Sequence, residues 1–162
     1  MGSPIAFLFT FRTYGTWFHG DERGSVDRKH NVHGTPFVES APNRVAWEEQ
    51  RLRFPPILFD EEMRTVVDGA FVEECEFRKW ELFSRAVRTN HVHLIVGFAG
   101  LRPENMGGKL KAHATQLLRR RRFIAQNRPV WADGPGSRRY LWSVADVNAA
   151  EAYVREGQDG PR

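Results

Sequence analysis

The chain has 162 residues, of which 24 are basic and 20 acidic, giving a net charge of +4 and an isoelectric point near 9.6. Hydrophobic residues make up 41% of it, which excludes an intrinsically disordered chain and predicts a single domain over residues 1–162. It has no run of about 18 apolar residues, which excludes a membrane-spanning helix, and its apolar segment 5–9 is too short for a signal peptide. Cys75 is the single cysteine, so an intrachain disulfide and a cysteine-rich metal site are excluded, and a cytoplasmic location is expected.

The basic charge is concentrated in the last third of the chain. Residues 1–100 carry 12 basic and 14 acidic side chains, a net charge of −2, whereas residues 101–162 carry 12 basic and 6 acidic, a net charge of +6. Seven basic residues and no acidic residue lie between Asn105 and Trp131. This pattern favours a polyanionic partner, with nucleic acid first and an acidic membrane surface second, although a solvated helix face has the same composition.

The first half of the chain predicts a strand, a long loop, a helix and a hairpin. Alternation over residues 5–13 indicates a strand with Phe7, Phe9 and Phe11 on one face. Residues 14–56 are polar and rich in Gly, Pro, His and Asn, which predicts a long loop insertion. Residues 60–76 have the apolar spacing of a helix, and the first three of them are acidic, which suits a helix N-terminus. Two strands, 79–87 and 91–98, follow with a tight connection between them.

The second half predicts a helix, a strand and a last helix. Pro103 opens a helix that runs to about residue 127, and a strand over 138–142 follows a Gly-Pro-Gly turn. Ser143 caps the last helix, which continues through Tyr153 and ends near Gly157. The first six elements have the ferredoxin-like split βαβ order. The predicted fold class is therefore α+β: a ferredoxin-like βαββαβ antiparallel sheet with two helices on one face and an extra C-terminal helix carrying Tyr153.

Two histidines two residues apart are the first candidate for chemistry. Side chains at this spacing on a strand point to the same face, so His91 and His93 lie side by side while Val92 and Leu94 face the core. Two adjacent imidazoles can share one metal ion, but a bare His-x-His pair is more often two structural histidines. A third ligand and a reactive group nearby would make the pattern specific.

The last helix offers both a reactive group and further ligands. Tyr153 is preceded and followed by small residues at one-turn spacing, which leaves space for a substrate to approach the phenol. Tyr153 is alternatively a packing residue, because it lies next to a packing stripe formed by Val147, Ala150 and Val154. Oxygen donors follow at Glu156, Gln158 and Asp159, and oxygen ligands combined with two imidazoles suit Mg²⁺ or Mn²⁺.

These residues resemble the HUH single-tyrosine transposases, which include insertion-sequence transposases and REP-associated tyrosine transposases of bacteria. The match is most specific at Asn90-His91-Val92-His93-Leu94, which is similar to the family's metal-binding strand. Thr10 to Trp17 resembles the family's first strand and its exit, and the strand ending at Trp142 with the Tyr153 helix resembles its catalytic end.

The resemblance implies a metal-dependent enzyme that nicks single-stranded DNA beside hairpins and transfers the strand through a 5′-phosphotyrosine intermediate. It implies that His91 and His93 hold Mg²⁺ or Mn²⁺ and that Tyr153 is the nucleophile. The family's third ligand lies one helical turn after the tyrosine; because Gly157 stands there and cannot ligate, Gln158 is the nearest candidate. The resemblance also implies a bacterial, nucleoid-associated protein, either monomer or homodimer.

A set of basic and aromatic residues is predicted to contact the DNA, mainly through phosphates, and we expect the basic helix to lie beside the histidines and Tyr153. The predicted DNA-binding residues are Lys109, Lys111, Arg119, Arg120, Arg122, Arg12 and Trp17.

Two other functions are consistent with the same residues. A non-catalytic module could bind single-stranded DNA or RNA hairpins on a ferredoxin-like sheet, and His91 and Tyr153 would then be dispensable. A metal-dependent phosphodiesterase with water as its nucleophile would need a carboxylate-rich site, for which only Glu156 and Asp159 are near Tyr153 in sequence.

Overall fold

A computed structural model describes residues 2–16 and 53–156 of the chain. Four strands and three helices form the described part, which confirms the predicted α+β class. Most of the loop predicted at 14–56 lies outside the described residues. In chain order the elements are β1 (Ala6–Arg12), α2 (Glu61–Arg78), β2 (Leu82–Val87), β3 (His91–Gly97), α3 (Pro103–Arg120), β4 (Ser137–Leu141) and α4 (Val144–Arg155).

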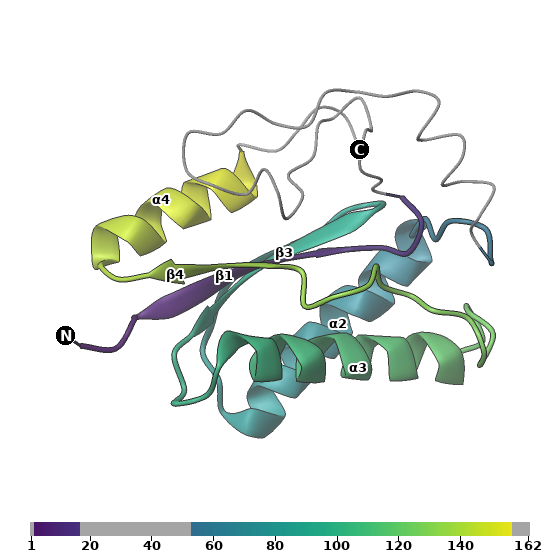
Figure 1. The fold of residues 1–162 in the computed structure, drawn as a ribbon, viewed down its shortest axis with the longest axis horizontal. Coiled ribbons are helices and arrows are strands. Elements are labelled where there is room, and N and C mark those ends of the chain that lie inside the picture. Colours follow the sequence, from purple (N-terminus) through teal and green to yellow (C-terminus); the bar gives the residue numbers. More distant parts are fainter. Residues whose placement is uncertain (1, 17–52, 157–162) are drawn as a thin grey trace.

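The strands form one antiparallel sheet in the order β2-β3-β1-β4. In Figure 1 this sheet lies between α4 and the layer of α2 and α3. This order places the first strand of the chain in the middle, paired to β3 on one side and to β4 on the other. The arrangement is consistent with a ferredoxin-like type. None of the described helices has the length and apolar content needed to span a membrane.

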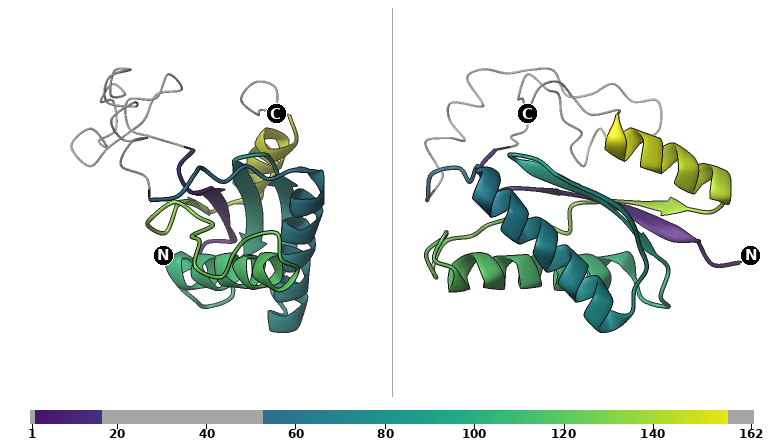
Figure 2. Two further views of the ribbon diagram at one scale, coloured as in Figure 1. Left: turned by 90° about the vertical axis from the view of Figure 1, so that its right-hand side faces the viewer. Right: turned by 180° about the vertical axis from the view of Figure 1, so that it is seen from behind.

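Alternation along β1 and β3 divides the sheet into two different faces. Phe7, Phe9 and Phe11 of β1 are buried with Val92, Leu94 and Val96 of β3 in the larger core, beneath α2 and α3. The intervening residues of β1 and β3 face the other way, where Leu8 and Ile95 belong to a smaller core. Figure 2 shows α2 and α3 together on one side of the sheet and α4 on the other.

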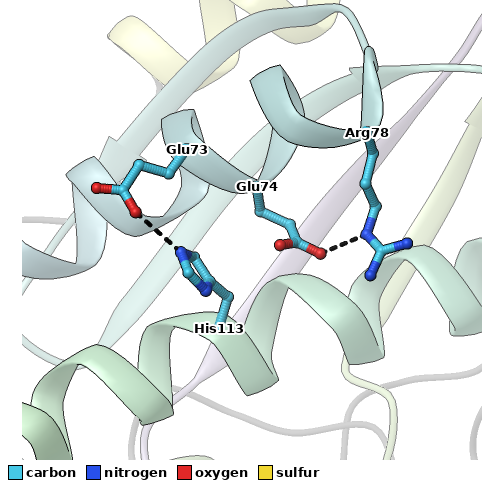
Figure 3. Close-up of polar contacts among 4 residues, drawn as sticks. All are labelled: Glu73, Glu74, Arg78 and His113. Atoms are coloured by element: carbon cyan, nitrogen blue, oxygen red, sulfur yellow. Dashed lines mark hydrogen bonds and ion pairs between the residues drawn. The ribbon is translucent and has the colours of Figure 1, made fainter.

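Polar contacts complete the α2–α3 layer. His113 of α3 lies 3.1 Å from the Glu73 carboxylate of α2, so an imidazole and an acid connect the two helices (Figure 3). Glu74, one residue further along α2, forms an ion pair with Arg78 one turn later. The first contact joins the two helices, and the second lies within α2.

The helix α4 packs on the second face through one stripe of small and branched residues. Val147, Ala150 and Val154 are its buried residues, at the helical spacing that was predicted from the sequence. They meet Leu8 and Ile95 in the smaller core. The predicted cap is confirmed, because the backbone N–H of Asp146 donates to the Ser143 hydroxyl over 3.1 Å.

The helix α3 is shorter than predicted, ending at Arg120 rather than near residue 127. Arg122 has a positive φ of 64°, and the Phe123 N–H donates to the carbonyl of Leu118. Together with the Arg122 N–H bonded to Arg119, this is a Schellman end formed without glycine. Ile124 still reaches the core, but from the chain after the helix.

We expect Cys75 to be chemically inert in the folded protein. It is buried on α2, and burial, with a smaller contribution from the Glu74 carboxylate, raises the pKa of its thiol to about 11. The thiolate is the reactive form, so alkylation by iodoacetamide at pH 8 should be at least about 100-fold slower than in the denatured chain. Rapid labelling of the folded protein would contradict this environment.

Gly136 and Gly134 allow a matched test of how tightly β4 approaches β1. Both have positive φ, but a Cβ at Gly136 would meet the Thr10 carbonyl oxygen at 2.6 Å, whereas one at Gly134 would meet nothing within 4 Å. Gly134→Ala should cost about 1–3 kcal/mol of unfolding free energy from backbone strain alone. Gly136→Ala should cost at least about 1 kcal/mol more because the added methyl group overlaps a backbone atom. Equal losses in urea denaturation would contradict the close approach.

Candidate metal and nucleophile site

His91 and His93 lie on the face of the sheet that α4 covers, as the spacing predicted. Val92 between them is in the larger core on the opposite face. The two imidazole rings have centroids 4.9 Å apart and a T-shaped arrangement. His91 is only 5% exposed and His93 only 2%, so both rings are held in a protein environment rather than at a solvated strand end.

A hydrogen bond orients the Nδ1 atom of each ring. His91 Nδ1 lies 2.9 Å from the amide oxygen of Asn90. Because an amide oxygen only accepts hydrogen bonds, this contact places the proton on Nδ1. His93 Nδ1 lies 2.9 Å from the Thr10 hydroxyl, which can accept in the same way. In a neutral ring with the proton on Nδ1, Nε2 carries the lone pair, which is the usual arrangement of a metal-ligating histidine and its supporting partner.

Tyr153 lies beside His93 on the same face. The ring centroids of the two residues are 5.2 Å apart with an angle of 67° between the planes. Because the neighbouring Val154 is buried against the sheet, the helix is anchored there while the Tyr153 ring remains 40% exposed. The structure thus brings together three of the predicted site residues: two imidazoles and one accessible phenol.

The donor set can be tested for its fit to a divalent ion. In residues 2–16 and 53–156, no three His, Cys, Asp or Glu side chains gather as a metal site. The two imidazoles fit as one pair of ligands: the Asn90 amide oxygen holds the His91 ring in the required tautomer, and the Thr10 hydroxyl can accept from His93 Nδ1 in the same tautomer. Gln158, the predicted third ligand, lies outside the described residues.

The predicted position of the basic segment beside this site is wrong. Lys109, Lys111, Arg119 and Arg120 belong to α3, which packs on the opposite face of the sheet from α4 and the histidines (Figure 1). Arg122 follows the end of that helix, and Trp17 lies outside the described residues. Of the predicted DNA-binding residues, Arg12 alone shares the histidine face in the described part of the chain, because it pairs with His91 in the β1–β3 register.

Some of the α3 cations have structural partners. A cleft of about 690 Å³ lies along α3 and is lined by Lys111, Arg119, Arg120 and Trp131 among others. The Lys111 ammonium donates to the Gly134 carbonyl over 2.8 Å, and burial lowers its pKa below the ordinary lysine value. Arg119 donates to the Arg128 carbonyl over 2.9 Å. These two residues therefore hold the chain that leads from α3 to β4, whatever else they bind.

Sequence reasoning assigned no role to Thr10 and Asn90, the two partners of the imidazoles. Asn90 directly precedes His91 and could have been recognised as a supporting residue from its position at the hairpin turn. Thr10 could not, because its proximity to His93 depends on the pairing of β1 with β3. The comparison with protein-family models and the comparison with curated proteins find no match to this chain.

Thr10→Val should weaken divalent-ion binding while the fold persists, because the His93 ring loses the hydroxyl that orients its Nδ1 atom. Loss of such a supporting partner typically costs about 10- to 100-fold in metal affinity, which Mn²⁺ titration calorimetry would measure. Thr10→Ser should retain the affinity. Thr65→Val is the matched control, since that hydroxyl bonds only the Glu61 carbonyl on α2. Unchanged Mn²⁺ affinity in Thr10→Val would contradict a ligand role for His93.

Proposed function

We propose that this protein is a metal-dependent single-stranded DNA transesterase of the HUH single-tyrosine type, with Tyr153 as its nucleophile. One observation carries the proposal: the phenol of Tyr153 lies against His93, whose ring in turn lies against His91. Two Nδ1-oriented imidazoles beside an accessible phenol form a combination suited to phosphoryl transfer. The proposal includes a hairpin-bearing DNA substrate and a ferredoxin-like catalytic domain.

The proposed reaction is a transesterification at phosphorus. The Tyr153 oxygen attacks the scissile phosphate, the bond from phosphorus to the 3′-oxygen breaks, and the phenolic proton is transferred to the leaving 3′-oxygen. The products are a 5′-phosphotyrosine link and a free 3′-hydroxyl. Because one phosphoester replaces another, a second DNA 3′-hydroxyl can reverse the step without ATP.

His91 and His93 would hold the metal ion, with Gln158 as the proposed third ligand. Bound Mg²⁺ or Mn²⁺ supplies Lewis-acid polarisation of a phosphate oxygen. Arg12 lies next to His91 across the β1–β3 pair, on the face where the phosphate would bind. In the described part of the chain it is the one proposed DNA-binding cation on that face, and it would orient the phosphate for attack.

One observation favours the alternative, a non-catalytic module for single-stranded DNA or RNA. Tyr153 directly precedes Val154, a residue of the α4 packing stripe, and its edge-to-face contact with His93 is also a common packing geometry. In that case the Tyr153–His93 contact stabilises the position of α4, and no covalent chemistry occurs. The two functions differ in a single product, the protein–DNA adduct.

We expect a covalent adduct between the wild-type chain and DNA. The substrate is a pool of hairpin oligonucleotides with randomised single-stranded flanks, labelled at the 3′ end because the fragment with the 5′-phosphate stays on the tyrosine. In Mg²⁺ or Mn²⁺ the adduct should migrate as a labelled protein on a denaturing gel. Tyr153→Phe should abolish it, and His91→Ala and His93→Ala should remove its metal dependence together with most of its yield.

Tyr14→Phe is the matched control, because Tyr14 follows β1 and packs on Phe54 rather than on His93. An adduct that survives Tyr153→Phe would refute the assignment of the nucleophile. Binding without any adduct would favour the non-catalytic module, and cleavage without an adduct would favour hydrolysis by water.

A further inference from the structure

Two large aromatic rings at the end of β4 are exposed and stacked on each other. Tyr140 and Trp142 have ring centroids 5.8 Å apart with only 25° between their planes. They are 44% and 52% exposed. Two neighbouring exposed aromatic rings form an apolar surface that is typical of a recognition site rather than of a solvated strand.

Contacts from behind hold this ring pair in place. The Tyr140 ring meets the buried Phe7 ring edge-on, with centroids 5.1 Å apart and an angle of 81°. The backbone N–H of Trp142 donates to the Asp146 carboxylate over 2.9 Å. Asp146 is itself fixed at the start of α4 by the Ser143 cap. The pair is therefore ordered before any ligand binds, which lowers the entropy cost of stacking a flat group on it.

Cations precede the rings on the same strand. Arg138 forms an ion pair with Glu104 of α3 at 2.8 Å, so its charge is largely compensated. Arg139 is exposed and points to the opposite face, where it pairs in register with Leu8. Arg139 and the ring pair therefore lie on the two sides of one edge strand, so a ligand that carries both phosphates and flat bases could meet both where it passes around that edge.

The strand also leads to the candidate site. Ser137, the first residue of β4, pairs with Thr10, whose hydroxyl contacts His93. From Ser137 to Trp142 the chain advances about 17 Å at the usual rise of a strand. Because the rings face the α3 side of the sheet, a nucleic acid strand with a phosphate near the histidines would have to pass around the β4 edge, which takes at least about five nucleotides at 3.4 Å per nucleotide of one strand.

A second copy of the chain fits this edge poorly. β4 pairs only with β1 in the described part of the chain, so its outer edge could accept another strand. Antiparallel pairing of two β4 edges around Arg138 and Arg139 would place like charges opposite each other, which is destabilising. A polyanion meets those charges favourably.

We infer that Tyr140 and Trp142 form a stacking platform for unpaired bases of a single-stranded nucleic acid, with Arg139, on the other side of the same edge strand, contacting a phosphate where the nucleic acid passes around the edge. The identity of the ligand as DNA rests on the proposed function. The inference of a platform rests on the exposure of the two rings, on the contacts that hold them in place and on the charge of the strand. Stacking recognises the flat face that every base has, so this contact selects single strands over duplexes without reading sequence.

The test measures binding separately from chemistry. In a Tyr153→Phe background without metal, fluorescence anisotropy gives the affinity of the full chain for a labelled single strand and for its duplex. Replacing both Tyr140 and Trp142 by Ala should weaken single-strand binding at least about tenfold, with a much smaller effect on the duplex. Replacing both by Phe should restore most of the affinity. Phe77→Ala is the matched control, because that ring is also exposed but lies on α2.

Arg139→Ala should reduce the salt dependence of single-strand binding by about 0.7 in the slope of log K against log salt, whereas Arg139→Lys should keep it. An oligonucleotide with 5-iododeoxyuridine should photocrosslink to the wild-type peptide that contains Tyr140 and Trp142. This readout does not depend on the folding of any variant.

Unchanged affinity in the double Ala variant, or crosslinks confined to other peptides, would overturn the platform. A wild-type dimer that dissociates when the rings are replaced would also overturn it, in favour of an interface between copies. Failure of the proposed function is distinguishable: the rings would still control single-strand affinity, but the wild type would form no phosphotyrosine adduct. If only the platform fails, the adduct forms and the ring variants bind normally.

Discussion

The antiparallel register of β1 and β3 is the constraint on which the rest of the structure depends. Pairing Thr10 with His93 and Arg12 with His91 places four polar side chains on one face. The same register places Phe11 opposite Val92 and Phe9 opposite Leu94 on the other face. A slip of β1 by one residue would move its phenylalanines out of the core, and a slip of β3 would move the imidazoles into it, so burial of the apolar face fixes the polar one. The large α2–α3 core therefore also positions the candidate site.

The second face of the sheet is covered only in part, and the position of α4 determines which part is covered. Its buried stripe of Val147, Ala150 and Val154 packs on Leu8, Ile95 and Leu141. This places the start of the helix over the apolar end of β1 and β3 and the residues near its end, including Tyr153, over the imidazole end. The site thus lies where an apolar contact surface gives way to a polar one. At such a boundary a ring can be held in position by its neighbours and still remain accessible.

Several features could be read from the sequence because they depend on local periodicity. The alternation around His91 and His93, the α4 stripe and the Ser143 cap are of this kind, and the structure has them as predicted. The end of α3 could not be predicted in this way. No glycine or proline marks it, and Arg122 adopts the left-handed conformation that ends the helix. The role of Thr10 was equally hidden, because it depends on a contact between residues 83 positions apart.

The prediction that the basic helix lies beside the histidines was wrong for a different reason: that placement conflicts with the predicted topology itself. In a split βαβ order both internal helices pack on one face of the sheet, and the helix after β4 takes the other. A predicted site on the face of α4 is therefore separated by the sheet from the cations of α3. Net charge in a stretch of sequence indicates a polyanionic partner but does not indicate on which face that partner is bound.

β4 is an edge strand, and its side chains lie on both faces of the sheet. As an edge strand it exposes side chains on both sides: Arg139 toward the face of the histidines and Tyr140 toward the face of α3. A polyanion attracted to the α3 cations could reach the imidazoles only by passing around an edge of the sheet, because the sheet interior is closed by packed side chains.

The two edges of the sheet differ in charge and in aromatic content. The β2 edge contributes an exposed Arg85, which already forms an ion pair with Asp68 of α2. β4 instead contributes an exposed arginine and two aromatic rings. The charge and aromatic content of the two edges therefore favour the β4 side as the path between the basic helix and the candidate site.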